Sequence, residues 1–251
     1  MEIVVAENAG ALGTVAGRKA ADLISQAIAA NGSANIILAT GSSQFATLSE
    51  LVADKKIDWS RVTMFHLDEY LGLSEEHPAS FRKYLKERFI FRVPIKDYHL
   101  INGENTGEVE CERLNAIISR VDIDVALIGI GENGHLAFND PPANFETDAP
   151  YIVVALDEAC RRQQVGEGWF TSLNDVPREA ISMSINQILK AKHIVCSVPD
   201  QRKAEAVRNC IEAKIDNRFP ATILRRHPAC YLYLDQQSAS KLSHPTDKVH
   251  E

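Results

Sequence analysis

Short apolar runs alternate with longer segments of helical periodicity along almost the whole chain, and this alternation is the feature that most restricts the fold. Continuous apolar runs suit strands that are buried on both faces of a parallel sheet. The predicted strands are 3–6, 35–39, 62–67, 125–130, 152–155, 193–198 and 229–234. The predicted helices are 15–30, 45–52, 81–91, 108–120, 175–190 and 201–213. Such alternation indicates βαβ units, so we expect an α/β fold with a doubly wound, mostly parallel sheet and helices on both faces.

Length and composition place the chain among ordinary globular proteins. We expect residues 1–240 of the 251 to form a single α/β domain and 241–251 to be a polar C-terminal tail, with fraying from Ser238 onward. The formal net charge of -7 argues against nucleic acid or an anionic membrane as the main partner, but not against a small anionic ligand. No apolar stretch approaches the roughly 20 residues of a membrane span.

The cysteines and the first residues indicate a compartment. The five cysteines are scattered and form no Cys-x-x-Cys pair, so we expect reduced thiols and no metal site. The first residues lack the basic segment followed by an apolar one that marks a signal peptide. We therefore expect a cytoplasmic protein.

The first polar segment at the end of a strand is Thr40-Gly41-Ser42-Ser43, between the strand 35–39 and the helix 45–52. Successive backbone N–H groups, with a helix N-terminus behind them, suit the binding of a phosphate group. The alternative is an ordinary helix N-cap formed by Ser42 or Ser43. The segment is not a Walker loop, because no Gly-Lys-Ser/Thr follows it.

A second polar segment, Asp68-Glu69-Tyr70, follows the strand 62–67. A carboxylate at the end of so apolar a strand is partly desolvated, which raises its pKa toward the range of a general base. The alternative is that one carboxylate caps the next segment or pairs with a lysine or arginine. We expect His66, within the strand, to be a packed core histidine.

A glycine-containing loop follows the strand 125–130 and brings Asn133, His135 and Asp140 close to the end of that strand. Ligands of open α/β sheets bind outside the carboxyl ends of the strands, so this loop is a candidate site. A tight turn with a surface histidine is the alternative. The loop also matches the Gly-x-Gly-x-x-Gly pattern of dinucleotide sites, but the proline-containing segment 138–142 arrives too soon for the helix that such a site needs.

Lys203 follows the strand 193–198 at the beginning of a predicted helix. A cation at a helix N-terminus opposes the helix dipole, so Lys203 makes more sense if it faces an anion across a cleft at the strand ends. The alternative is a solvated surface lysine.

Together these segments resemble the glucosamine-6-phosphate deaminase/isomerase family, whose fold is shared with 6-phosphogluconolactonases. The resemblance covers about residues 39–235 and rests on the segments 39–43, 65–73 and 129–141. It implies isomerisation and deamination of glucosamine-6-phosphate to fructose-6-phosphate and ammonia, in amino-sugar catabolism, without a cofactor or metal. The implied partner is a small phosphorylated amino sugar, and the chain would act as a monomer or homo-oligomer.

The resemblance also implies roles for individual residues. Asp68 matches the base that takes a proton from the carbon beside the carbonyl, and His135 matches the residue that opens the sugar ring. Asn133 and Asp140 match the flanking partners of this histidine. The positions that match phosphate-binding residues are Thr40, Gly41, Ser42, Ser43 and Lys203.

The sequence departs from the family pattern at two places. The family usually has Glu where this chain has Asp140. Because the side chain of Asp is shorter, we expect that its contact with His135 needs a bridging water or a shifted loop. The phosphate-contacting arginine of the family is replaced by Gly168, and Arg161 or Arg162 is a candidate substitute. A 6-phosphogluconolactonase and a galactosamine-6-phosphate isomerase are the alternative functions. The lactonase ranks lower because its motif after the central strand differs.

Overall fold

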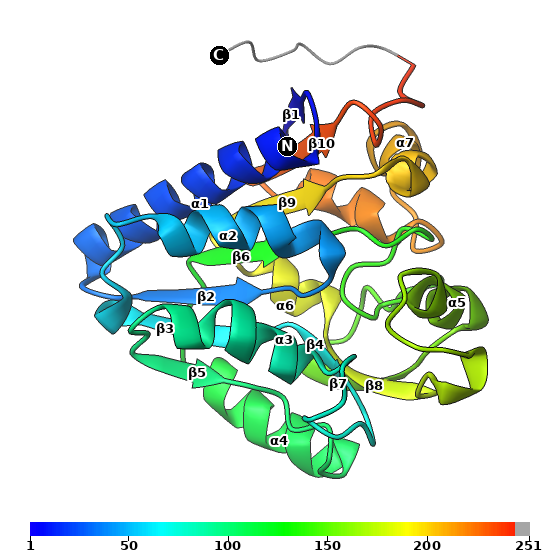
Figure 1. Ribbon diagram of the computed structural model, residues 1–251, viewed down its shortest axis with the longest axis horizontal. Helices are drawn as coiled ribbons and strands as arrows, with labels where there is room; N and C mark the ends of the chain where they lie inside the picture. Colours follow the sequence, from blue (N-terminus) through cyan, green and yellow to red (C-terminus); the bar gives the residue numbers. More distant parts are fainter. Residues whose placement is uncertain (244–251) are drawn as a thin grey trace.

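The computed structural model describes residues 1–243, and its main element is a sheet of seven strands (Figure 1). All neighbouring strands in this sheet are parallel. Their order is β1 (Glu2–Ala6), β10 (Cys230–Asp235), β9 (His193–Val198), β6 (Val125–Ile128), β2 (Ala34–Leu38), β3 (Val62–His66) and β5 (Asp97–His99). The chain runs outward from β2 to β5 and then returns to β6 beside β2. The carboxyl ends of β2 and β6 therefore form a topological switch point, where ligands of such sheets bind.

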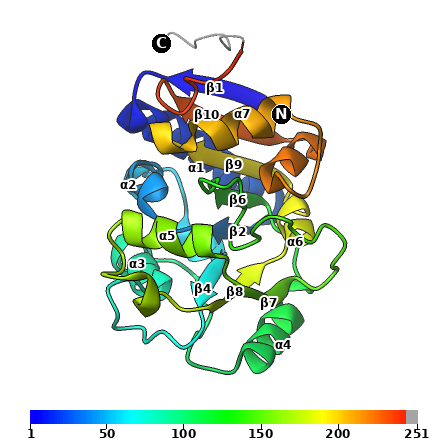
Figure 2. The ribbon, with the colours of Figure 1, turned by 90° about the vertical axis from the view of Figure 1, so that its right-hand side faces the viewer.

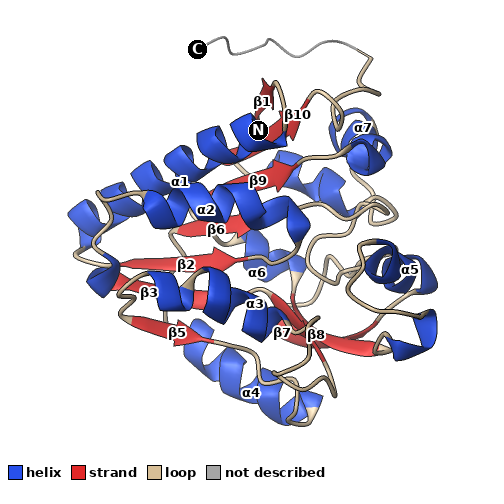
Figure 3. Cartoon of the chain, viewed as in Figure 1, coloured by secondary structure: helices blue, strands red, loops and turns tan. Residues whose placement is uncertain are grey.

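Helices cover both faces of the main sheet, which confirms the predicted doubly wound α/β class (Figure 3). Ile36 and Leu38 of β2 pack in one apolar cluster with α1 (Ala9–Asn31), α2 (Phe45–Ala53) and α3 (Phe81–Arg88). Ile37 packs in the opposite cluster. That cluster is completed by α4 (Gly107–Ile118), α6 (Ile185–Leu189) and α7 (Ala204–Glu212). Successive side chains of a strand point to opposite faces, so one short apolar run supplies both cores.

A smaller antiparallel sheet adjoins the main one, with the order β4 (Asp68–Tyr70), β8 (Glu179–Met183) and β7 (Tyr151–Ala155). Only Leu67 separates β3 from β4, and its carbonyl accepts a hydrogen bond from the N–H of Met183 at 2.9 Å. The chain thus passes directly from one sheet into the other immediately before Asp68.

The predicted helix 175–190 is wrong. Residues Glu179–Met183 form β8, and the helix is limited to the short α6, which Ser184 caps by accepting a hydrogen bond from the N–H of Gln187. The segment pairs with a strand on each side and has four consecutive buried residues from Ala180 to Met183. Because both faces are covered, the apolar spacing of this segment does not distinguish a strand from a helix.

The other differences from prediction concern element ends and short elements. α1 begins at Ala9, six residues before the predicted start, where the side chain of Asn8 accepts a hydrogen bond from the N–H of Ala11 at 3.0 Å. The three-residue β5 and the helix α5 (Glu158–Gly166) were not predicted. His66 is the packed core histidine that was expected, and burial followed by the charge of Arg82 lowers its pKa to about 3.

The segment after β10 packs on the protein as far as the structure describes it. Ser238 is fully buried, and its hydroxyl accepts a hydrogen bond from the N–H of Asp235 at 3.0 Å. Ser243 donates its backbone N–H to Glu212 at 2.7 Å. The expected fraying from Ser238 is therefore wrong up to Ser243, and the rest of the predicted tail, 244–251, lies outside the described residues. Within residues 1–243, no helix is long and apolar enough to cross a membrane.

Candidate active site

A cavity of about 390 Å³ lies at the carboxyl ends of the strands and brings most of the predicted site residues together. Figure 2 looks onto this end of the molecule, with α5 in front of the strands. Among the predicted residues, those that line the cavity are Thr40, Gly41, Ser42, Ser43, Asp68, His135 and Lys203. Asn133 and Asp140 are not in the cavity wall and lie directly behind His135.

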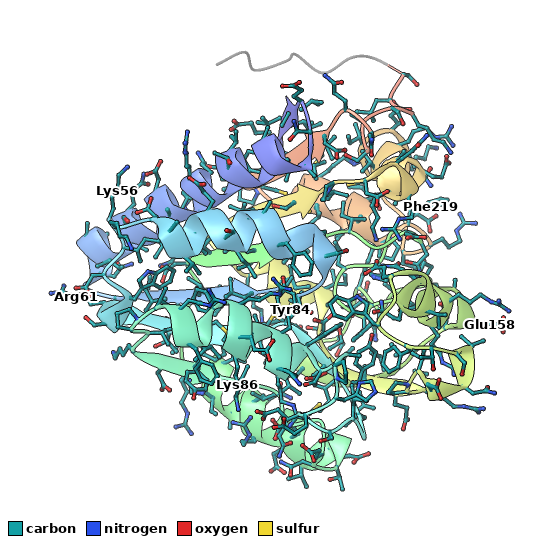
Figure 4. The ribbon with its side chains drawn as sticks, in the orientation of Figure 1. Lys56, Arg61, Tyr84, Lys86, Glu158 and Phe219 are labelled. Carbon is teal, nitrogen blue, oxygen red and sulfur yellow. The ribbon has the colours of Figure 1, made fainter. Side chains whose placement is uncertain are left out.

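The loop Thr40 to Ser43 leaves β2 and is held by contacts to α3, β6 and β9. Gly41 has φ of 96°, and its carbonyl accepts a hydrogen bond from the hydroxyl of Tyr84 at 3.1 Å, a side chain labelled in Figure 4. The amide of Gln44, the residue after the loop, donates to the carbonyls of Ile128 and Ser197 at 3.3 and 3.4 Å, at the ends of β6 and β9. The loop is thus fixed to the two neighbouring strand ends, and its four residues line the cavity.

Asp68 is the first residue of β4, and its side chain reaches the cavity although it is only 7% exposed. Burial, followed by the negative charge of Glu69, raises the pKa of Asp68 to about 8. A carboxyl group with such a pKa can accept a proton from carbon near neutral pH and then hold it.

Glu69 points away from the cavity because successive side chains of a strand alternate. Its carboxylate accepts hydrogen bonds from the hydroxyl of Ser80 at 3.1 Å and from the backbone N–H of Arg82 at 2.8 Å. The guanidinium Nε of Arg82 lies 3.4 Å away from the same carboxylate. The alternative that one of the two carboxylates caps the next segment or pairs with an arginine therefore applies to Glu69, and Asp68 is left to face the cavity.

His135 and Asp140 form a direct pair. The Nδ1 atom of His135 lies 2.9 Å from Oδ1 of Asp140, which also accepts a hydrogen bond from the amide of Asn133 at 3.0 Å. The other oxygen, Oδ2, accepts the backbone N–H of Asp157 at 3.2 Å. The expected water between Asp140 and His135 is thus wrong, because the contact is direct. The alternative, a shifted loop that compensates for the shorter side chain, stays a prediction.

The surroundings favour a charged Asp140 and a fixed ring of His135. Burial alone would raise the pKa of Asp140, but the bonds from His135, Asn133 and the N–H of Asp157 together lower it. Gly131 lies against the imidazole, since a Cβ atom at this position would be 2.2 Å from Nε2 of His135. Only glycine leaves room for the ring here, and Nε2 remains the atom available to a ligand in the cavity.

Lys203 contributes a buried cation to the cavity wall. It is 6% exposed, and burial lowers the pKa of its ammonium group. Its Nζ atom lies 3.7 Å from Oε1 of Glu167. The neighbouring Arg202 is bound to Asp200 at 2.8 Å and lies 3.5 Å from Glu132.

Neither candidate for the missing arginine reaches the cavity. Arg161 donates to the carbonyl of Val176 at 3.1 Å and to that of Leu173. Arg162 is exposed and pairs with Glu158 on the outer side of α5. The hypothesis that Arg161 or Arg162 replaces the arginine is therefore wrong, because both side chains are engaged elsewhere and neither lines the cavity.

Among the described residues, one group of side chains is close enough to share a metal ion, with ligand atoms of His135, Asp140 and Cys160 within 4.8 Å of one another. Two of these ligand atoms are already engaged with each other, and burial raises the pKa of the Cys160 thiol well above its usual range. The contact between His135 and Asp140 is one through which a proton can be held or passed on.

Comparison with known proteins assigns this arrangement to a family. The family described as glucosamine-6-phosphate isomerases/6-phosphogluconolactonase matches residues 7–232. The chain belongs to this family. Among its members, a glucosamine-6-phosphate deaminase of Lactobacillus delbrueckii subsp. bulgaricus is 36% identical over 243 residues, covering 96% of this chain and 100% of the relative. The corresponding deaminase of Exiguobacterium sibiricum is 40% identical over 207 residues, covering 82% of this chain and 80% of the relative.

Solved structures of the isomerase/lactonase family have the same fold. A monomeric glucosamine-6-phosphate deaminase is similar with a TM-score of 0.87 and 32% identity, covering 96% of this chain and 99% of that one. The 6-phosphogluconolactonase of Trypanosoma brucei has a TM-score of 0.80 at 16% identity, covering 96% and 98% of the two chains. The second likeness concerns the fold alone.

The cavity of this family member also contains residues that the sequence did not single out. They are Gln163, Gln164, Glu167, Trp169, Asp200 and Asp235 among others. Asp200 and Asp235 follow or end apolar strands, which is the signal that identified Asp68, and it could have been applied to them. The residues of α5 and the turn after it carry no such signal, because they belong to a segment that departs from the family pattern.

Proposed function

We propose that the protein is a glucosamine-6-phosphate deaminase that converts its substrate and water into fructose-6-phosphate and ammonia. The observation that carries this proposal is that Asp68 and His135 line one cavity with the Thr40 to Ser43 loop and Lys203. Relatives that match most of this chain bear the same name. In enzyme-class terms the reaction is hydrolysis of a C–N bond that is coupled to an isomerisation.

The geometry supports a separate role for each group of residues in the cavity. The loop and Lys203 would bind the phosphate ester, and binding at a distance from the reacting carbon orients the sugar. The His135–Asp140 pair would carry the proton at the ring oxygen while the ring opens, with Asn133 holding Asp140. Asp68 would then take the proton from C2 of the open aldehyde and return it at C1. Together with the passage of a proton from the amine to the carbonyl oxygen, this transfer converts the amino aldose into a ketose imine, to which water adds before ammonia leaves.

The cysteines and the net charge agree with a metabolic enzyme of a reducing compartment. The five cysteines are all free and buried, which fits the cytoplasm, where thiols stay reduced. The formal charge of -7 does not suit a nucleic-acid partner.

The test is ammonia release by the pure protein from glucosamine-6-phosphate and galactosamine-6-phosphate, with hydrolysis of 6-phosphogluconolactone measured in parallel. We expect ammonia and fructose-6-phosphate from glucosamine-6-phosphate, and loss of both in Asp68→Asn. Ammonia release from galactosamine-6-phosphate alone would change the proposed substrate to that sugar phosphate. Lactone hydrolysis without ammonia from either sugar would overturn the proposal in favour of the other branch of the family.

A further inference from the structure

Glu167 is a buried carboxylate in the cavity that the proposed reaction does not use. Its side chain is 8% exposed and lies just after α5. Oε1 accepts a hydrogen bond from the amide of Gln163 at 2.8 Å, and Oε2 accepts one from the indole of Trp169 at 3.2 Å. The same Oε1 lies 3.7 Å from Nζ of Lys203. The carboxylate is therefore held by two neutral donors beside the cation that would bind phosphate.

This arrangement conflicts with simultaneous binding of a phosphate ester. Such an ester carries a charge of about -1.5 to -2 at pH 7. If it bound Lys203 while Glu167 stayed in place, two anionic groups would lie within a few ångströms of each other in a cavity wall that excludes much of the solvent. Like charges repel strongly at that distance, and the repulsion grows as water is excluded. Arg202 gives little relief, because Asp200 and Glu132 already neutralise it.

Glu167 lies between two glycines that no other part of the described chain packs against. Gly168 has φ of 81°, which side-chain-bearing residues rarely adopt. A Cβ atom built on Gly166 or Gly168 would meet nothing within 4 Å.

We propose that Glu167 is an internal counter-ion of Lys203 and that the phosphate of the ligand displaces it. Glu167 thereby selects ligands by the charge of the group that they bring to Lys203. This inference rests on the proposed function, because it takes a phosphorylated sugar as the ligand. A neutral sugar has no negative charge that could replace the carboxylate beside Lys203, and a singly charged group only equals the charge of the carboxylate. A doubly charged ester attracts Lys203 more strongly than the carboxylate does and therefore displaces it.

The competing role for Glu167 is a direct contact to a hydroxyl or amine of the sugar, and it predicts no gain in phosphate binding when the side chain is neutralised.

The experiment measures binding of inorganic phosphate to the wild type and to Glu167→Gln, from the rise of the melting temperature with phosphate concentration at constant ionic strength. The matched control is Glu158→Gln, which removes the same charge from the outer side of α5, where Glu158 points into solvent (Figure 4). We expect phosphate to bind about tenfold more tightly to Glu167→Gln, which corresponds to about 1.4 kcal/mol, and with unchanged affinity to Glu158→Gln. Adding Lys203→Gln should remove the gain.

Equal or weaker phosphate binding by Glu167→Gln would overturn the inference, and so would an equal gain in Glu158→Gln. If Glu167→Gln does not fold, Trp169→Phe removes one of the donors that hold the carboxylate, and it should also tighten phosphate binding. Unchanged or weaker binding by that variant would count against the inference. Phosphate binding needs no turnover, so a protein that releases no ammonia would still give a result here, and an unchanged phosphate affinity would leave the deaminase proposal standing.

Discussion

Replacing Asp68 by Asn should stabilise the protein increasingly as the pH rises. The pKa of Asp68 is raised from 3.8 to about 8, so the folded protein favours the neutral carboxyl group and the unfolded chain ionises it. Stability from this group is therefore present at low pH and is lost as the pH rises through the folded pKa. From pH 6 to about pH 8 the loss is about 1.4 kcal/mol for each pH unit, or about 3 kcal/mol in all. Asparagine does not ionise, so the variant escapes this loss.

The assay is urea unfolding at pH 6 and pH 9, followed by the fluorescence of the buried Trp59 and the partly buried Trp169. The quantity of interest is how the difference in unfolding free energy between Asp68→Asn and the wild type changes between the two pH values. Contacts that the substitution alters at every pH cancel in this comparison. A difference that stays constant from pH 6 to pH 9 would refute the raised pKa and, with it, the reason for choosing Asp68 as the base.

Three further predictions concern activity and the residues behind the cavity. In the wild type, kcat/KM for ammonia release should rise about tenfold per pH unit below the Asp68 pKa of about 8 and level off above it, in a pH–rate profile. Asp140→Asn should lower kcat at least about 100-fold in steady-state assays, because His135 loses the carboxylate at 2.9 Å, and Asp140→Glu should retain more activity. Arg82→Met should lower the unfolding free energy by about 3 kcal/mol in urea titrations, because it leaves the buried Glu69 without its cation.

The sequence predicted which residues lie at the cavity where polar residues directly follow an apolar strand. Thr40 to Ser43, Asp68 and His135 each follow an apolar run, and the carboxyl ends of parallel strands meet at one edge, so these groups share a cavity. The sequence could not give the order of the strands, because a βαβ pattern does not say on which side of β2 the next strand is added.

The failures have physical causes that lie in tertiary contacts. The strand β8 was taken for part of a helix because its burial on both faces hides the alternation that marks a strand. The direct contact between Asp140 and His135 depends on a loop conformation in which Ala137 has φ of 53°, and residue type alone does not predict this for alanine. Glu167 was missed because its surroundings come from α5, a helix without a clear apolar pattern.

The single residue Leu67 between β3 and β4 has a consequence for how this scaffold can diversify. The loop Thr40 to Ser43 and Lys203 follow strands of the seven-stranded sheet, whereas Asp68 belongs to the three-stranded one. If the proposed function is right, the phosphate end and the reacting carbon of the sugar would be held from two different sheets. No residue of β7 or β8 lines the cavity. Substitutions in these two strands could therefore shift the carboxyl group of Asp68 relative to the phosphate end without altering a ligand contact.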